Sequence, residues 1–202
     1  MVGLKARVVM QSGNILLAGV GGQGILLASE ILSSALLRGG FDVKQSEVHG
    51  MAQRGGSVVS HVRYGKKVFS PLIELGTADI TVSFELLEAL RYLPYYRKGS
   101  TVIVNTQKIL PAPVATGLEV YPPDAIGQLQ SRDLLVYAID AFGIAASVGE
   151  QRAVNMVLVG ALSKLLPVEE KIFMEIIAGR IPEKIRKVNT EAFLKGREMI
   201  PV

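Results

Sequence analysis

The feature that most constrains the fold is an apolar strand that leads straight into a glycine-rich turn and a helix. Residues 14–19 (NILLAG) form a continuous apolar run ending in glycine, which is typical of a strand buried on both faces of a sheet. Residues 24–37 then place apolar side chains on one helical face, and Gly39 and Gly40 end the helix. A second strand follows at residues 42–47. This order indicates an α/β fold with a Rossmann-like, mostly parallel sheet and flanking helices.

The glycine-rich turn has the spacing G-x-G-x-x-G between a strand and a helix, where that spacing carries meaning. Its ligand-binding candidates are Gly19, Gly21, Gly22, Gln23 and Gly24. Because the free amides of a helix N-terminus favour phosphate, the turn predicts a nucleotide or phosphate site. A tight turn that only packs the helix on the strand is the competing interpretation. Glu47 ends the second strand, where a dinucleotide fold holds the ribose, but no acid–base set of a dehydrogenase follows.

The middle of the chain departs from a plain alternation of strands and helices. Residues 57–64 alternate like a strand with one wet face, and a glycine–lysine turn connects them to residues 68–72, which predicts a β-hairpin insertion. Further predicted elements are strands at residues 78–84, 100–105 and 133–140, a helix at 86–93, a proline-rich crossing at 110–123, and C-terminal helices at 153–166, 169–178 and from Pro182. No linker interrupts the chain. We therefore expect one domain over residues 1–202, with an extension at 1–12 and a helical C-terminal part at 150–202.

Composition excludes several classes of site. Cysteine is absent, so this chain holds no iron–sulfur cluster through thiolates and has no disulfide framework, as is common in cytoplasmic proteins. With only two histidines, a zinc site is not expected either. The net charge of +4 is small and spread out, so no nucleic-acid surface is predicted. The uncharged stretch 8–29 is broken by polar residues and glycines, short of the roughly 20 apolar residues that span a bilayer, so no membrane association is expected.

The most informative stretch is a polar, glycine-containing loop at residues 47–57, with the sequence EVHGMAQRGGS. Its candidates for contact with a partner, or for closing an active site, are Glu47, His49, Met51, Gln53, Arg54, Gly55, Gly56 and Ser57. This combination of polarity and backbone freedom suits a contact surface better than a core. Arg54 offers a planar fork for a carboxylate or phosphate, and His49 can titrate near neutral pH. We assign no catalytic residue and no metal ligand within this chain.

Six motifs occur in order along the chain. They are GVGGQG, SEVHGMAQRGGSVVSHVRYG, SPLI, FELLEALRYLPY, VNTQKILP and RAVNMVLVGAL, which begin at residues 19, 46, 70, 84, 104 and 152. With them the sequence resembles the gamma-type subunit or domain of the 2-oxoacid:ferredoxin oxidoreductases, and in particular the beta subunit of the indolepyruvate type. The resemblance covers residues 14–166, and the joint presence of the motifs is specific where the glycine turn alone is not.

The resemblance implies a subunit of an enzyme, inactive alone. Enzymes of this family oxidatively decarboxylate a 2-oxoacid to an acyl-CoA, with CoA as co-substrate, and reduce ferredoxin. In the indolepyruvate type, thiamine diphosphate, magnesium and the iron–sulfur clusters lie on a large alpha subunit in an α2β2-like complex. This chain is therefore expected to bind no cofactor alone and to meet ferredoxin only indirectly. We expect the 47–57 loop to pack against the large subunit and to help close its active site.

Three alternatives remain open on the sequence. The first is the equivalent subunit of a pyruvate, branched-chain, phenylglyoxylate or 2-oxoglutarate ferredoxin oxidoreductase. The second is a free-standing, nucleotide-binding Rossmann-like protein that uses the glycine turn. The third is a structural scaffold whose turn binds nothing. They differ in whether the isolated chain binds a nucleotide, and in whether changes in the loop alter the turnover of a complex.

Four further polar residues are expected to serve the fold. His61 lies within a strand and is predicted to be a satisfied core or interface histidine. Asn105 and Asp140 each end a buried strand at the same edge of the sheet, where they are expected to cap the segments that follow. Asn155 lies on an apolar helix, where a polar side chain most often forms a hydrogen bond between elements.

Overall fold

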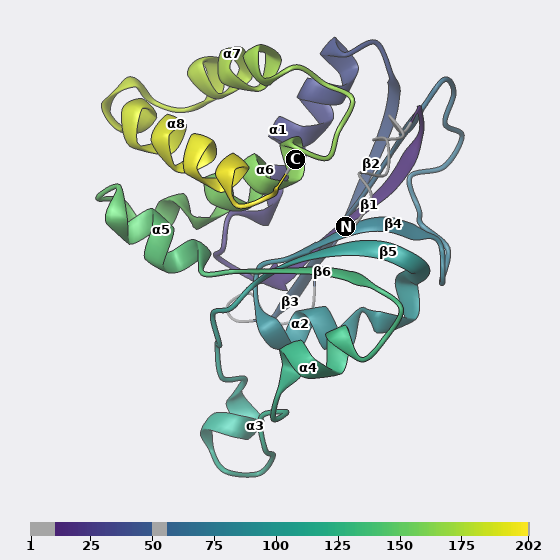
Figure 1. The fold of residues 1–202 in the computed structure, drawn as a ribbon, viewed down its shortest axis with the longest axis vertical. Coiled ribbons are helices and arrows are strands. Elements are labelled where there is room, and N and C mark those ends of the chain that lie inside the picture. The colour runs from purple at the N-terminus through teal and green to yellow at the C-terminus, as the bar shows by residue number, and fades with distance from the viewer. Residues whose placement is uncertain (1–10, 50–55, 202) are drawn as a thin grey trace, which may run out of the picture.

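A computed structural model describes residues 11–49 and 56–201, apart from the side chain of His49. The described part contains a central sheet with the strand order β2-β3-β1-β4-β5-β6 (Figure 1). Its strands are β1 (Gly13–Val20), β2 (Asp42–His49), β3 (Ser57–Gly65), β4 (Ala78–Ser83), β5 (Tyr96–Asn105) and β6 (Leu135–Ile139). The neighbours β1, β4, β5 and β6 are parallel, and β3 is antiparallel to both β1 and β2. The predicted α/β fold with a mostly parallel sheet is therefore confirmed.

Strand β1 lies inside the sheet between β3 and β4, and both of its faces are buried. Ile15 and Leu17 point into the larger apolar core, whereas Leu16 and Ala18 belong to a smaller cluster on the other face. This alternation is what a period of two residues imposes on a strand. It confirms the prediction from the uninterrupted apolar run.

Helices cover both faces of the sheet (Figure 1). One face carries α1 (Ile25–Arg38), α5 (Ala141–Ser147), α6 (Val154–Ser163), α7 (Glu170–Arg180) and α8 (Glu183–Glu198), with the short 3-10 turn Gln151–Ala153. The other face carries α2 (Leu86–Arg91), the 3-10 turn Leu93–Tyr95 and α4 (Ala125–Gln130), while α3 (Ala112–Ala115) stands off below. The predicted helical C-terminal part is confirmed. None of the helices in the described ranges is long and apolar enough to cross a bilayer.

The predicted hairpin between residues 57–64 and 68–72 is wrong. Strand β3 is inserted between β1 and β2, so both of its edges are already paired and residues 68–72 form no strand. A side chain provides hydrogen bonds to the backbone of that segment instead, because Arg63 donates from Nη1 to the carbonyls of Ser70 and Leu72. The antiparallel pair of the fold is formed by β2 and β3. For the same reason β2 does not pair with β1, as a plain strand–helix–strand unit would require.

The proline-rich crossing at residues 110–123 is less irregular than its composition suggests. It contains the one-turn helix α3, and α4 follows directly, with Asp124 accepting a hydrogen bond from the amide of Gly127. Short helices of this length carry too few residues for a periodic apolar face, so the sequence pattern does not reveal them.

Candidate functional site

Most of the sequence-predicted site lies at the carboxyl edge of the parallel strands. At this edge β1 leads into α1 on one face of the sheet, whereas β4 leads into α2 on the other (Figure 1). Such a point, where adjacent strands send their connections to opposite faces, is where open α/β sheets place binding sites. The glycine turn follows β1 here, and the 47–57 loop joins β2 to β3 at the same edge.

The first half of the glycine turn is packed against β4. A Cβ atom at Gly19 would lie 2.7 Å from both Gln23 and Phe84, so only glycine fits. The Gln23 side chain folds back, accepting from the Val20 amide at 2.7 Å and donating to the Phe84 carbonyl at 2.9 Å. Gln23 therefore ties the turn to the end of β4, a role that the motif spacing does not reveal.

The second half of the turn is packed against α6 and against the end of the 47–57 loop. Gly22 and Gly24 have φ angles of +97° and +75°, a region that side chains rarely adopt. The Asn155 amide donates to the Gly24 carbonyl at 3.4 Å, so the predicted structural role of Asn155 is confirmed. The Gly21 amide donates to the Gly56 carbonyl at 2.9 Å. In a phosphate site such an amide faces the ligand, so this bond favours the structural interpretation of the turn.

The 47–57 loop is described only at its two ends. Glu47 is half-buried in β2, and the backbone of His49 ends that strand. Ser57 begins β3, and its Oγ donates to Glu88 Oε2 at 2.5 Å. The remaining candidates lie outside the described residues: Met51, Gln53, Arg54 and Gly55. The structure thus joins two groups of candidates, because Gly56 contacts the glycine turn while Ser57 contacts α2.

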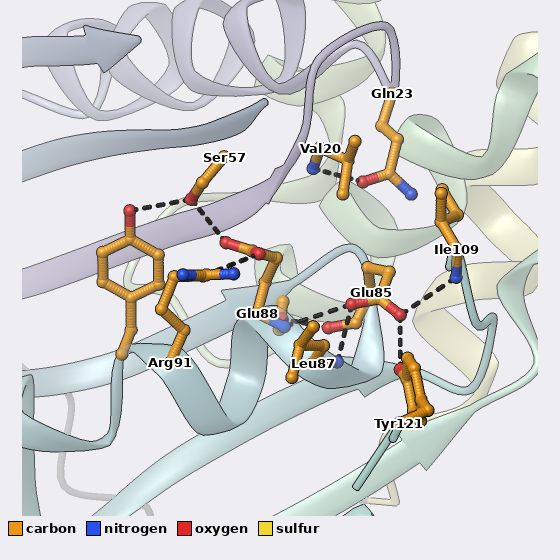
Figure 2. A network of polar contacts seen from close by, with 11 residues as sticks. Val20, Gln23, Ser57, Glu85, Leu87, Glu88, Arg91, Ile109 and Tyr121 are labelled. Atoms are coloured by element: carbon orange, nitrogen blue, oxygen red, sulfur yellow. Dashed lines mark hydrogen bonds and ion pairs between the residues drawn. The ribbon is translucent and has the colours of Figure 1, made fainter. Parts of the chain in front are cut away.

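Sequence reasoning missed the carboxylate that accepts the hydrogen bond from the Ser57 hydroxyl. Glu88 is buried, with 4% of its side chain exposed, and its Oε1 accepts from Arg91 Nε at 2.9 Å (Figure 2). The Tyr92 hydroxyl lies 3.1 Å from Ser57 Oγ, and burial raises the pKa of Tyr92. Ser57 and Glu88 are 31 residues apart, so no local pattern links them.

A second carboxylate, Glu85, was also missed. It is buried, and its Oε2 accepts from the amides of Leu87 at 2.6 Å and Glu88 at 3.1 Å, which caps α2. Its Oε1 accepts from the Ile109 amide at 3.0 Å and from the Tyr121 hydroxyl at 2.5 Å (Figure 2). Burial raises the pKa of Tyr121, which therefore stays a donor at neutral pH. The spacing E-x-x-E directly after a buried strand was the available signal for this cap.

The other polar residues of the edge serve the fold, as predicted. Asn105 donates to the Phe84 carbonyl at 3.0 Å and accepts from the Ala141 amide at 3.2 Å. Asp140 caps α5 by accepting from the amide of Gly143 at 2.8 Å. These bonds connect the ends of β4, β5 and β6. The edge is therefore a hydrogen-bonded platform.

His61 also has the structural role that was predicted for it. It is buried, and its Nδ1 accepts from the Ile73 amide at 3.2 Å. Its ring packs edge-on against Tyr95, and burial lowers its pKa, which favours the neutral form.

The two buried carboxylates of this platform are engaged in supporting neighbouring segments. Both Glu85 and Glu88 are occupied as hydrogen-bond acceptors, by amides, hydroxyls and a guanidinium. Among the described residues no group of three or more His, Cys, Asp or Glu side chains is arranged to hold a metal ion. This chemistry suits a surface that holds the adjoining loops in place.

Known proteins resemble this chain over almost its whole length. Residues 14–199 match the profile of the pyruvate ferredoxin/flavodoxin oxidoreductase family. Indolepyruvate oxidoreductase subunit IorB of Thermococcus kodakarensis is 42% identical over 93% of this chain and 95% of its own. The gamma subunit of a keto/oxoacid ferredoxin oxidoreductase from Geobacter sulfurreducens has a TM-score of 0.70 and 23% identity, covering 93% of this chain and 97% of that one.

A third similar structure belongs to a longer chain. It is the 2-oxoglutarate:ferredoxin oxidoreductase of Magnetococcus marinus with 2-oxoglutarate, coenzyme A and succinyl-CoA bound, with a TM-score of 0.73 and 24% identity. The match covers 94% of this chain but 31% of that one, so there the same fold is one part of a larger polypeptide. At these identities the structural matches show a shared fold.

Proposed function

Because the chain belongs to the pyruvate ferredoxin/flavodoxin oxidoreductase family, we propose that it is the small subunit of a cytoplasmic 2-oxoacid:ferredoxin oxidoreductase of the indolepyruvate type. The observation that carries the proposal is the 42% identity to an indolepyruvate oxidoreductase subunit over 93% of the chain. The reaction joins the acyl group of the oxoacid to the sulfur of CoA, releases carbon dioxide and passes the two electrons to ferredoxin. An arylpyruvate is the expected substrate.

The cofactors of this reaction are placed on the large alpha subunit. Thiamine diphosphate with magnesium supplies the carbanion chemistry, and iron–sulfur clusters carry the electrons to ferredoxin. The residues of this chain do not fit these groups, because the sequence has no cysteine and the described part has no metal-ligand cluster. We therefore assign no step of the reaction to a side chain of this subunit.

The contribution of this chain is to present its carboxyl edge to the large subunit. The 47–57 loop packs there and helps close the active site of the large subunit in an α2β2-like complex. The bonds from Gly56 to the glycine turn and from Ser57 to α2 support this role, because they fix the end of the loop at the edge. The isolated chain is then inactive, since it holds only one side of the site.

Reconstitution tests the proposal. The purified chain and its large subunit are mixed without oxygen, and CoA-dependent reduction of ferredoxin or a viologen dye is measured with indolepyruvate, phenylpyruvate, pyruvate and 2-oxoglutarate. We expect activity only with both chains, and the fastest rate with an arylpyruvate. If the chain neither binds the large subunit nor changes its activity, the proposal is wrong; a pyruvate or 2-oxoglutarate preference would assign the chain to the corresponding enzyme instead.

Arg54 is the sharpest test of the loop within that complex. Replacing Arg54 by alanine removes a bidentate donor, and we expect turnover to fall roughly tenfold, the size of one lost hydrogen bond to a charged group. Unchanged turnover together with unchanged assembly would contradict the role of the loop.

The glycine turn is tested on the isolated chain, which is titrated with ATP and NAD by calorimetry. We expect no binding, because the Gly21 amide already donates to the Gly56 carbonyl.

A further inference from the structure

The segment between β5 and α4 stands away from the rest of the molecule at the carboxyl edge (Figure 1). We refer to residues 107–123 as the projecting segment. Residues 109–118 include no charged side chain. Leu118 and Val120 are 81% and 88% exposed, and Leu110 is 54% exposed. Glu119 stands between Leu118 and Val120 in the sequence, and Lys108 lies near the base of the segment. Exposed apolar side chains on a projection indicate an interaction site, because their contact with water costs free energy.

The projecting segment has an ordered internal structure. The amide of Ala115 donates to the Pro111 carbonyl at 2.9 Å, and the amide of Leu118 donates to the Pro113 carbonyl at 2.8 Å. Gly117 follows α3 with a φ of +78°, which ends the helix and turns the chain toward the exposed residues Leu118 and Val120, here called the tip. A single helical turn is not stable alone in water. The shape of the segment must therefore be set by its base.

Glu85 fixes that base. Its Oε1 accepts from the Ile109 amide at one end of the segment and from the Tyr121 hydroxyl at the other (Figure 2). Lys108 lies over the ring of Tyr121, with its Nζ 5.5 Å from the ring centroid. Burying a carboxylate is costly unless it is fully hydrogen-bonded. Because the Glu85 carboxylate joins the two ends of the projecting segment, it holds the apolar tip at a defined distance and direction from the sheet.

We propose that the projecting segment is a docking knob, which inserts Leu118 and Val120 into an apolar groove on the large subunit of the complex. This inference rests on the proposed function and names a second contact beside the 47–57 loop. The two contacts share one support, because Glu85 holds the knob and Glu88, three residues later in the same helix, holds Ser57 at the end of the loop. A convex apolar tip needs a concave partner surface, as in other helix-and-loop anchors of protein interfaces.

The large subunit fits this tip better than a second copy of this chain does. A stable interface uses about 20–30 residues on each partner, so the tip suffices only as one part of a larger surface, such as the proposed one that includes the 47–57 loop. In the Magnetococcus marinus enzyme the matched fold covers 31% of one chain, so further polypeptide of that enzyme is covalently attached to the fold there.

The test compares two variants in the reconstituted complex. In Leu118→Asp/Val120→Asp the tip becomes charged, and we expect affinity for the large subunit to fall roughly a hundredfold, as for the lost burial of two aliphatic side chains. Excess variant should restore the full rate, since the tip only binds. The matched control is Leu37→Asp, which changes a 55% exposed leucine at the end of α1 on the opposite edge and should leave affinity unchanged.

Photo-crosslinking gives a second measurement, which does not require a substitution that weakens the complex. A benzophenone side chain at position 118 should form a covalent product with the large subunit, and one at position 37 should not. If the wild-type chain fails to bind the large subunit, the proposed function itself fails. If it binds and the double variant binds equally well, or the product at position 118 is a dimer of this chain, the knob is refuted while the proposed function stands.

Discussion

Glu85 and Glu88 are three residues apart and support different parts of the carboxyl edge. Glu85 caps α2 and joins the two ends of the projecting segment. A glutamate at the third position of a helix often turns back to the capping residue. Glu88 instead accepts from Ser57 and Arg91, so its side chain is committed to the end of the 47–57 loop. At the scale of residues, the structure of the carboxyl edge depends on which hydrogen-bond donor each buried carboxylate oxygen of Glu85 and Glu88 accepts from.

Removing the Ser57 hydroxyl should therefore destabilise the chain even without a partner. Ser57→Ala leaves Glu88 Oε2 without this donor, and we expect the free energy of unfolding to fall by about 2 kcal/mol, as for a hydrogen bond to a charged group. Urea unfolding of the isolated chain measures it. Ser131→Ala is the control, because that exposed hydroxyl donates to the nearby Gln128 carbonyl at the end of α4 and its loss should change stability by less than about 0.5 kcal/mol. Equal losses in both variants would contradict the role of Ser57.

His61 should make stability depend on pH in a predictable direction. Burial lowers the pKa of His61 in the folded chain, whereas the unfolded value is about 6.5. The unfolded state then binds the proton more readily, so stability is complete above the unfolded pKa and declines as pH falls through the window below it. Urea midpoints between pH 8 and pH 5 should follow this decline. In His61→Gln the decline should be smaller, and an identical pH profile in that variant would assign the effect to other groups.

At the scale of elements, the order of strands in the sheet was not accessible from the sequence. The alternation in residues 57–64 predicted a strand correctly, but alternation is a local property and does not identify the neighbours of a strand. Residues 68–72 looked like a hairpin partner because they are largely apolar. In the structure β1 and β2 already occupy both edges of β3, and Arg63 holds the later segment by its carbonyls. The long apolar strand β1 and helix α1 were predictable because their own periodicities determine which faces are buried.

Helices α6 and α8 approach each other through two glycines. A Cβ atom at Gly160 would collide with the Phe193 carbonyl, and one at Gly196 would collide with the Val157 carbonyl. Gly160→Ala should therefore lower the free energy of unfolding by about 2–3 kcal/mol, as overpacking does in close contacts. The matched control is Gly179→Ala in α7, where a Cβ meets nothing within 4 Å.

The control should change stability in the opposite direction. Replacing a helical glycine by alanine in open space stabilises by about 0.5–1 kcal/mol, because the unfolded chain loses conformational freedom. Thermal and urea unfolding of both variants should thus move to opposite sides of the wild-type protein. Stabilisation by Gly160→Ala would show that the two helices can separate at no cost, contrary to the packing in the structure.

At the scale of the whole molecule, the sequence located the candidate site but not its supports. The glycine turn and the 47–57 loop were predicted separately, and the bond from Gly21 to Gly56 brings them together at one edge. Their meeting follows from two strands ending on the same side of a sheet, which the element order predicts. The support by Glu85 and Glu88 depends on contacts with residues 24 to 36 positions away, and no sequence period encodes such contacts.

We propose that the chain is one domain, and unfolding should show it. Residues of α6, α7 and α8 share a single apolar core with β1 and α1, so the C-terminal helices cannot leave without exposing the face of the sheet. The sequence contains no tryptophan, and its tyrosines all lie in the sheet half: Tyr64, Tyr92, Tyr95, Tyr96, Tyr121 and Tyr137. Tyrosine fluorescence therefore reports mainly on the sheet, while circular dichroism at the helical band also reports on the C-terminal helices. Urea transitions followed by the two signals should coincide, as they do for a two-state domain, and an earlier loss of helical signal at constant fluorescence would instead make the C-terminal helices a separate unit.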